Sequence, residues 1–96
     1  MYSISEIRDI VAPIARRHGV ERMTLFGSYA RGDNTPSSDI DFRIDRGSVR
    51  GLQMAFLLTD LEDALKVKVD LLPTTALDDA FLSSIRGEEK LIYERN

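Results

Sequence analysis

The sequence LFGSYARGDNTPSSDIDF, residues 25–42, sets two kinds of local structure side by side. An apolar run ends at Phe26, and Gly27 follows it as a residue that accepts sharp turns. Residues 39–45 then alternate charged and apolar side chains. Alternation with a period of two is typical of a strand that buries one face. The stretch therefore predicts two strands, 21–26 and 39–45, joined by a turn or short helix and a loop.

The connection between these two strands constrains their relative direction. It is marginal in length for a parallel crossover and ample for a chain that folds back on itself. In an antiparallel pair, Asp39 and Asp41 begin beside Gly27 and Ser28. The sequence therefore predicts acidic side chains next to the glycine turn.

The N-terminal segment predicts a helix over residues 4–18. Ser3 and Glu6 have the spacing of a capping box, and the basic run that ends in Gly19 is a helix stop signal. Pro13 lies inside this helix. Because proline removes a backbone hydrogen bond and clashes with the preceding turn, we expect a kink or a short break there.

The C-terminal half continues the alternation of helices and strands. Its expected elements are a helix over 52–65, a strand over 67–72, a helix capped by Thr75 with Asp78 and ended by Gly87, and an edge strand over 90–94. Side chains expected in the core include Phe56, Leu57, Leu61 and Phe81. A helical crossover makes the second and third strands parallel, and this pairing brings Asp70 alongside Asp41.

These elements predict one domain over residues 1–96 of the α/β (α+β) class. It is a small mixed β-sheet flanked by helices, in the order α-β-α-β-α-β-α-β. The hydrophobic content of 43% and the charged content of 30% are those of an ordinary globular protein.

The composition also excludes several classes of function. The formal net charge of −3 argues against direct binding to duplex DNA or to an anionic membrane surface. No cysteine is present, which excludes disulfides, thiolate metal sites and cysteine nucleophiles. Apolar stretches are too short for a membrane span, and the N-terminus lacks the pattern of a signal peptide, so we expect a cytoplasmic protein.

The charges within the chain are unevenly placed, and this points to a cation. Four aspartates fall within residues 33–45. Asp39 and Asp41 lie about 6.6–6.8 Å apart on one strand face, so both carboxylates are able to reach one hard cation or to bridge two. Mg²⁺ binds such oxygen ligands together with substrate phosphates, and paired ions activate an attacking oxygen and stabilise a leaving one. Gly27 and Ser28 add backbone N–H groups and a hydroxyl suited to an anion. Together they predict phosphoryl or nucleotidyl transfer.

Each of these features has a simpler explanation when it is taken alone. An Asp-x-Asp pair is usually a solvated strand face, and Gly27-Ser28 is usually a plain turn. Asp70 alone is an ordinary surface residue paired with Lys68. Phosphatases of the haloacid dehalogenase type and glycosyltransferases also use Asp-x-Asp, but in longer chains, and neither explains Gly27-Ser28 or Asp70. The combination is what favours nucleotidyl transfer.

The combined motif resembles the nucleotidyltransferase signature of the DNA polymerase β superfamily. The resemblance rests on Leu25 to Gly32, on Ser38-Asp39-Ile40-Asp41-Phe42 and on Val69-Asp70-Leu71-Leu72. It covers nearly the whole chain, whose size is similar to that of the minimal nucleotidyltransferases, the smallest branch. It implies the polymerase β-like nucleotidyltransferase fold.

The resemblance also implies the roles of individual residues. Asp39 and Asp41 would bind two Mg²⁺ ions, and Asp70 would complete the site of the ion that activates the acceptor hydroxyl. Gly27 and Ser28 would hold the β- and γ-phosphates of a nucleoside triphosphate. Arg31 stands where the family has a basic residue; it either contacts phosphate or is an exposed helix cation that offsets the aspartates.

Two other polar residues have simpler expected roles. His18, the only histidine, is expected to interact with the helix dipole at the end of the first helix rather than to act as a base or a metal ligand. Tyr29 is expected to be an exposed helix residue beside the turn.

The resulting hypothesis is an Mg²⁺-dependent nucleotidyltransferase that moves AMP from ATP to a hydroxyl. No acceptor-binding domain follows the core, so we expect a separate chain to carry the acceptor. In families of this type the partner is commonly a helical HEPN protein, and some pairs are toxin–antitoxin systems in which a tyrosine of the toxin is adenylylated. Two other functions remain as alternatives: neutralisation of a partner by contact alone, and modification of a small molecule such as an aminoglycoside. The sequence leaves open whether the chain forms a homo-oligomer or a hetero-oligomer.

Overall fold

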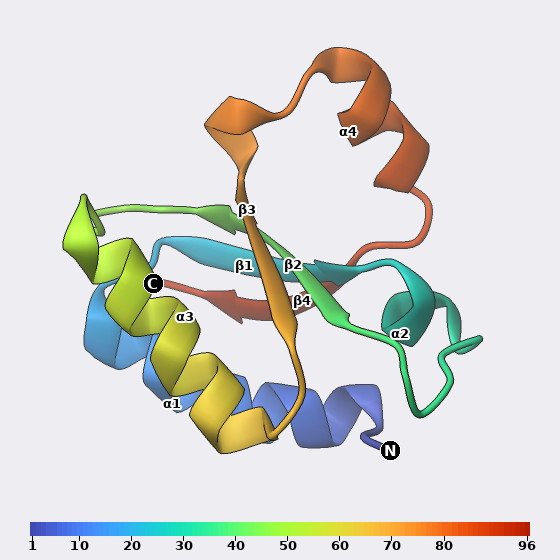
Figure 1. Ribbon diagram of the computed structural model, residues 1–96. Coiled ribbons are helices and arrows are strands. Elements are labelled where there is room, and N and C mark those ends of the chain that lie inside the picture. Colours follow the sequence, from blue (N-terminus) through green and yellow to red (C-terminus); the bar gives the residue numbers. More distant parts are fainter.

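The computed structural model describes residues 1–96 and contains a four-stranded mixed sheet with helices on both sides (Figure 1). The predicted α+β class and the predicted order of elements are confirmed. The elements are α1 (Ile4–His18), β1 (Arg22–Phe26), α2 (Ser28–Arg31), β2 (Ile40–Asp45), α3 (Leu52–Leu65), β3 (Val69–Pro73), the 3₁₀ turn η1 (Thr74–Ala76), α4 (Asp79–Ile85) and β4 (Lys90–Glu94). None of the helices has the length and apolar content needed to cross a membrane.

The first helix begins and ends where the sequence predicts. Ser3 and Glu6 form the reciprocal capping box, and Gly19 ends the helix in the left-handed conformation. The expected break at Pro13 is wrong, because α1 continues through it. Pro13 and Asp9 are both exposed, so the lost hydrogen bond to the Asp9 carbonyl falls on the solvent side of the helix, where a donor from water costs least to substitute.

The strand order is β3-β2-β1-β4. The antiparallel pairing of β1 with β2 and the parallel pairing of β2 with β3 are both confirmed. Asp41 lies opposite Phe26 of β1 and opposite Asp70 of β3. Strand β4 forms the other edge, antiparallel to β1, with a register shift between Met23 and Thr24. This register is what places the acidic residues beside the end of β1.

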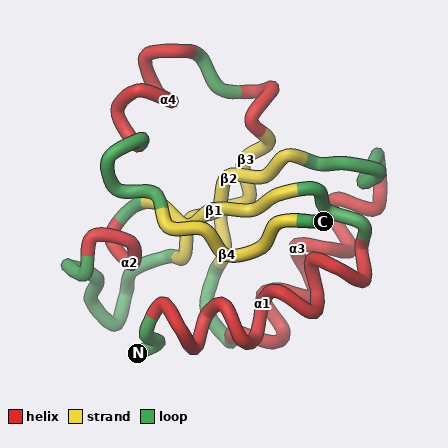
Figure 2. Tube along the Cα trace, turned by 180° about the vertical axis from the view of Figure 1, so that it is seen from behind, coloured by secondary structure: helices red, strands yellow, loops and turns green.

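Helices α1 and α3 lie side by side on one face of the sheet and enclose the core (Figures 1 and 2). The core contains Leu57 and Leu61, as predicted. Phe56, however, is 59% exposed, so its predicted core position is wrong. Residues 57, 61 and 65 form the buried stripe of α3, and Phe56 precedes that stripe by about 100° of helical rotation.

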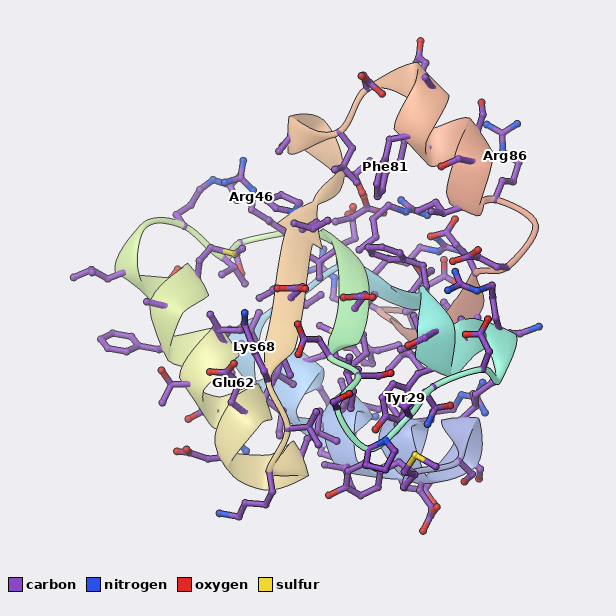
Figure 3. The ribbon with its side chains drawn as sticks, turned by 45° about the vertical axis from the view of Figure 1, so that its right-hand side comes forward. Tyr29, Arg46, Glu62, Lys68, Phe81 and Arg86 are labelled. Atoms are coloured by element: carbon purple, nitrogen blue, oxygen red, sulfur yellow. The ribbon has the colours of Figure 1, made fainter.

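Helix α4 lies on the other side of the sheet from α1 and α3 (Figure 1). Asp78 caps α4 by accepting a hydrogen bond from the Phe81 amide at 2.8 Å, so the predicted Thr75 cap is wrong. Thr75 instead lies in η1. The half-buried Phe81 ring reaches from α4 toward the sheet and meets Phe26 edge-to-face at 5.7 Å (Figure 3). This contact attaches α4 above the end of β1.

Candidate active site

Asp41 and Asp70 lie next to each other on the sheet face opposite α1 and α3. Ile40 and Phe42 are fully buried toward the helices, so alternation directs Asp41 to the other face. The same alternation around the buried Val69 directs Asp70 to that face. Their parallel register makes the two residues direct neighbours. The structure therefore brings together two of the three predicted carboxylates.

Gly27 closes the end of β1 directly against Asp41. Its φ of 78° and ψ of −156° belong to a region that side chains rarely tolerate. A Cβ atom at this position would overlap the Asp41 carboxylate. The glycine is therefore required by the backbone conformation and by the closeness of the acidic side chain, as the spacing of the motif predicts.

The electrostatics of the acidic pair favour the binding of a cation. The pKa of Asp41 is raised to about 6 by burial first, then by a hydrogen bond with Asp70 and by repulsion from Asp70 and Asp39. Arg31 opposes this shift weakly. A bound cation would reverse the repulsion, and all the available donors are carboxylate oxygens, which Mg²⁺ prefers. The residues present therefore fit a magnesium ion.

Asp39 lies just before β2, and its side chain is 38% exposed. Its carboxylate is 4.0 Å from the Nζ of Lys68, which follows α3 and stands beside Glu62 (Figure 3). No three acidic or histidine side chains converge on one point close enough to hold a metal ion. Asp39 therefore lies apart from the pair, and its side chain would have to leave Lys68 and change rotamer to share a cation with Asp41 and Asp70. An exposed side chain does this at little cost.

The Gly27 turn already holds an anionic group from within the chain. The Gly27 amide donates a hydrogen bond of 2.5 Å to Oε2 of Glu88, a residue between α4 and β4. The Arg31 guanidinium lies 3.3 Å from both oxygens of Glu88 and 3.1 Å from Asp33. These hydrogen bonds, that of Asp33 first, raise the pKa of Arg31. Arg31 is thus an exposed cation paired with Asp33 and Glu88, while half-buried Ser28 follows the turn.

A second glutamate, Glu89, anchors the same loop to the sheet. It accepts hydrogen bonds from Arg43 at 2.7 and 3.1 Å and from the Thr24 hydroxyl at 2.5 Å. Burial raises the pKa of Glu89, but the bonds from Arg43 and Thr24 bring it below its ordinary value. The sequence analysis missed both glutamates. Their only local signal is a pair of acids just before an edge strand, and their partners lie 46 to 65 residues away.

The comparisons with known proteins identify the family. The model of the polymerase β nucleotidyltransferase family matches residues 9–96. The chain belongs to this nucleotidyltransferase family. The likeness extends to whole proteins of similar length. A Methanocaldococcus jannaschii protein, provisionally named a protein adenylyltransferase, is 34% identical over 87 residues, which cover 90% of this chain and 94% of the relative.

Solved structures support the same assignment for this nucleotidyltransferase. One, described provisionally as a minimal nucleotidyltransferase, is 29% identical, has a TM-score of 0.79, and matches 93% of this chain and 95% of its own. Another is a tri-AMPylated Shewanella oneidensis HEPN toxin in complex with MNT antitoxin, matched with a TM-score of 0.71 over 96% of this chain and 73% of that chain. At 18% identity the second likeness concerns the fold alone.

Other polar and aromatic residues of the nucleotidyltransferase have structural roles. His18 lies 2.6 Å from Asp60 and joins the end of α1 to α3. Tyr29 is only 6% exposed, so the expectation of an exposed tyrosine is wrong; its ring faces the α1 side of α2 and joins the core (Figure 3). The hollow of about 530 Å³ beside Tyr29 and Tyr2 contains none of the acidic site residues. Asp41 and Asp70 are partly exposed and lie outside this hollow.

Proposed function

We propose that this nucleotidyltransferase transfers AMP from ATP to a hydroxyl group of a partner protein. The observation that carries the proposal is the register of Asp41 with Asp70, with Gly27 packed against Asp41. This arrangement sets a cation-binding carboxylate pair beside a backbone amide that binds anions. A triphosphate with its counter-ions needs both at once.

The proposed roles follow from the positions of the side chains. Asp41 and Asp70, joined by Asp39, would hold Mg²⁺, which supplies neutralising charge for the phosphates and activates the acceptor oxygen. The Gly27 amide, Ser28 and Arg31 would bind the β- and γ-phosphates. The acceptor oxygen forms a bond to the α-phosphorus, the bond to pyrophosphate breaks so that pyrophosphate leaves, and the acceptor hydroxyl loses its proton to solvent water. The protein contributes mainly positioning and electrostatic stabilisation.

The proposed acceptor is a HEPN-type protein, for which this chain would act as antitoxin. Support comes from the fold likeness to the complex of an AMPylated HEPN toxin with MNT antitoxin, and from the name of the M. jannaschii relative. A hydroxyl of the partner, such as that of a tyrosine, would approach the sheet face that carries the partly exposed acidic pair.

The test combines the purified chain with Mg²⁺, ATP and the product of the adjacent gene, the candidate for the HEPN-type partner. Intact mass spectrometry should show the partner gaining AMP. Asp41→Asn should slow the transfer by about 100-fold or more, since it removes a charge that stabilises the reacting groups. Asp45→Asn is the matched control, because Asp45 lies on the same strand and alternates with buried residues in the same way. Asp45→Asn should change the rate of AMP transfer by no more than a few-fold.

The alternative function, neutralisation of the partner by contact alone, is separated by the same variants. If Asp41→Asn still binds and neutralises the partner as the wild type does, the contact is sufficient and the catalytic proposal is wrong. If neutralisation is lost while the complex still forms, AMP transfer is the function.

A further inference from the structure

Glu88 occupies the two groups that the proposed function assigns to phosphate. One carboxylate oxygen accepts the hydrogen bond from the Gly27 amide, and both oxygens face the Arg31 guanidinium. The side chain of Glu88 is only 20% exposed, so little water separates it from these partners. An anion with two acceptor oxygens is thus already held where a terminal phosphate would bind.

The neighbouring residue fixes Glu88 in this place. Glu89 is held by Arg43 and Thr24, whose side chains come from β2 and β1. The backbone amides of both glutamates donate to the carbonyl of Ile85 at 3.0 and 3.1 Å, which continues from the end of α4. The loop is therefore attached on both sides, and its position is a built feature of the fold.

Glu88 and a triphosphate cannot use the Gly27 amide together. The amide has one hydrogen, and a second anion beside Glu88 would face like charge at hydrogen-bond distance. We infer that Glu88 is an internal competitor of the nucleotide: its carboxylate closes the phosphate site, and a nucleoside triphosphate must displace it to bind. This inference rests on the proposed function, because it takes Gly27 and Arg31 as the phosphate-binding groups.

An internal competitor lowers the apparent affinity by the fraction of molecules in which the site is open. Its removal should therefore tighten binding without a new contact to the nucleotide. Glu88→Ala removes both acceptor oxygens and should lower the Kd for Mg²⁺-ATP by about 5- to 30-fold, the range expected for losing one charge-assisted hydrogen bond. Glu88→Gln keeps a neutral acceptor and should give a smaller gain.

Asp33→Ala is the matched control for this experiment. Asp33 also pairs with Arg31, so its removal deletes the same charge and releases the same guanidinium, but it does not touch the Gly27 amide. Its side chain is 62% exposed, and loss of an exposed ion pair should change the Kd by less than about fivefold. If Glu88→Ala lowers the Kd more than Asp33→Ala does, the extra decrease measures how far Glu88 occupies the Gly27 amide.

Calorimetric titration with Mg²⁺-ATP and with sodium tripolyphosphate tests the inference. Both ligands should bind Glu88→Ala more tightly than wild type, because the competition concerns phosphate and not the base. In wild type, titration should move the Gly27 amide resonance and the Glu88 side-chain carboxyl resonance together.

Four results are decisive. Tighter binding to Glu88→Ala than to Asp33→Ala supports competition at Gly27. Equal Kd values for wild type and Glu88→Ala, or weaker binding by the variant, overturn the inference while AMP transfer by the wild type still upholds the proposed function. If Mg²⁺-ATP binds Glu88→Ala but binds neither the wild type nor Asp33→Ala, this supports the inference most directly. Absence of binding to every variant, together with absence of AMP transfer, overturns both.

Discussion

At the scale of the residue, Asp41 is a group that costs the fold stability. Its pKa of about 6 lies above the ordinary value of 3.8. Between these two values the folded state binds more protons than the unfolded state. Stability therefore falls as the pH rises toward 6, and above that pH the cost is fully present. Burial and the neighbouring acids are the cause, and both belong to the candidate site.

The first prediction concerns Asp41→Asn. Without divalent cations and at about pH 7.5, this variant should be more stable than wild type by about 1 kcal/mol, after allowance for the screening of a partly exposed group. Below about pH 3 the difference should vanish, since Asp41 is then protonated in the folded state and largely protonated in the unfolded state as well. Urea unfolding at the two pH values measures it. A variant less stable than wild type at the higher pH would contradict the assignment of Asp41 as a strained acid.

The residue scale also shows what sequence alone was able to predict. The neighbouring positions of Asp41 and Asp70 were predictable, because their strands alternate apolar and polar residues and a helical crossover makes the two strands parallel. The position of Glu88 was not predictable, because it depends on how α4 ends and on a clamp formed by Arg43 and Thr24. The burial of Tyr29 was predicted wrongly for a related reason, since it depends on packing into the core and not on the local sequence.

At the scale of the element, the short helix α2 is defined by a glycine at each end. Gly27 and Gly32 both have positive φ, 78° and 85°. Their surroundings differ, because a Cβ on Gly27 would collide with Asp41 and a Cβ on Gly32 would meet nothing within 4 Å. Substitution of Gly32 therefore tests the cost of a positive φ alone, and substitution of Gly27 tests that cost together with the clash against Asp41.

Gly32→Ala should destabilise the protein by about 1 kcal/mol, the usual cost of a left-handed residue with a side chain. Gly27→Ala should cost at least about 2–3 kcal/mol, because it adds a rarely populated backbone region and displacement of Asp41. It should also abolish AMP transfer, which Gly32→Ala should largely retain. Thermal melts and the mass-based transfer assay give both readouts. If both variants lost the same free energy of unfolding, the Asp41 side chain would be able to move away from a methyl group at position 27 without cost, and the close contact would not be required.

Elements with strong local signals were predicted best. The bounds of α1, α3 and β4 match the expected ranges, because caps, a long helical period and flanking turns act within a few residues. The predicted cap of α4 was wrong because Asp78 and Thr75 both offer cap chemistry, and Thr75 is taken up by the 3₁₀ turn η1, so that α4 begins after Asp78. Phe56 was misplaced because α3 is apolar on more than its buried stripe.

At the scale of the whole molecule, the two faces of the sheet divide the tasks. One face holds α1 and α3 (Figure 2) and nearly all of the core. The other face carries Asp41, Asp70 and the loop of Glu88 and Glu89. A site on the second face is able to change its charge and its occupant without disturbing the core. The stability cost of ionised Asp41 should therefore be offset when a cation binds.

Mg²⁺ should raise the melting temperature of the wild type, and the rise should depend on pH. Stabilisation by a ligand grows with its concentration and reaches about 2.7 kcal/mol at one hundred times the Kd. The metal requires the deprotonated form of Asp41, so its effect should be large at about pH 7.5 and should weaken below about pH 6. Asp41→Asn should remove it, and Asp45→Asn should retain it. Melts in MgCl₂ and in NaCl of equal ionic strength separate binding from screening. An equal rise in both salts would show that the acidic face attracts cations only diffusely, and the carboxylates would then have no ligating role.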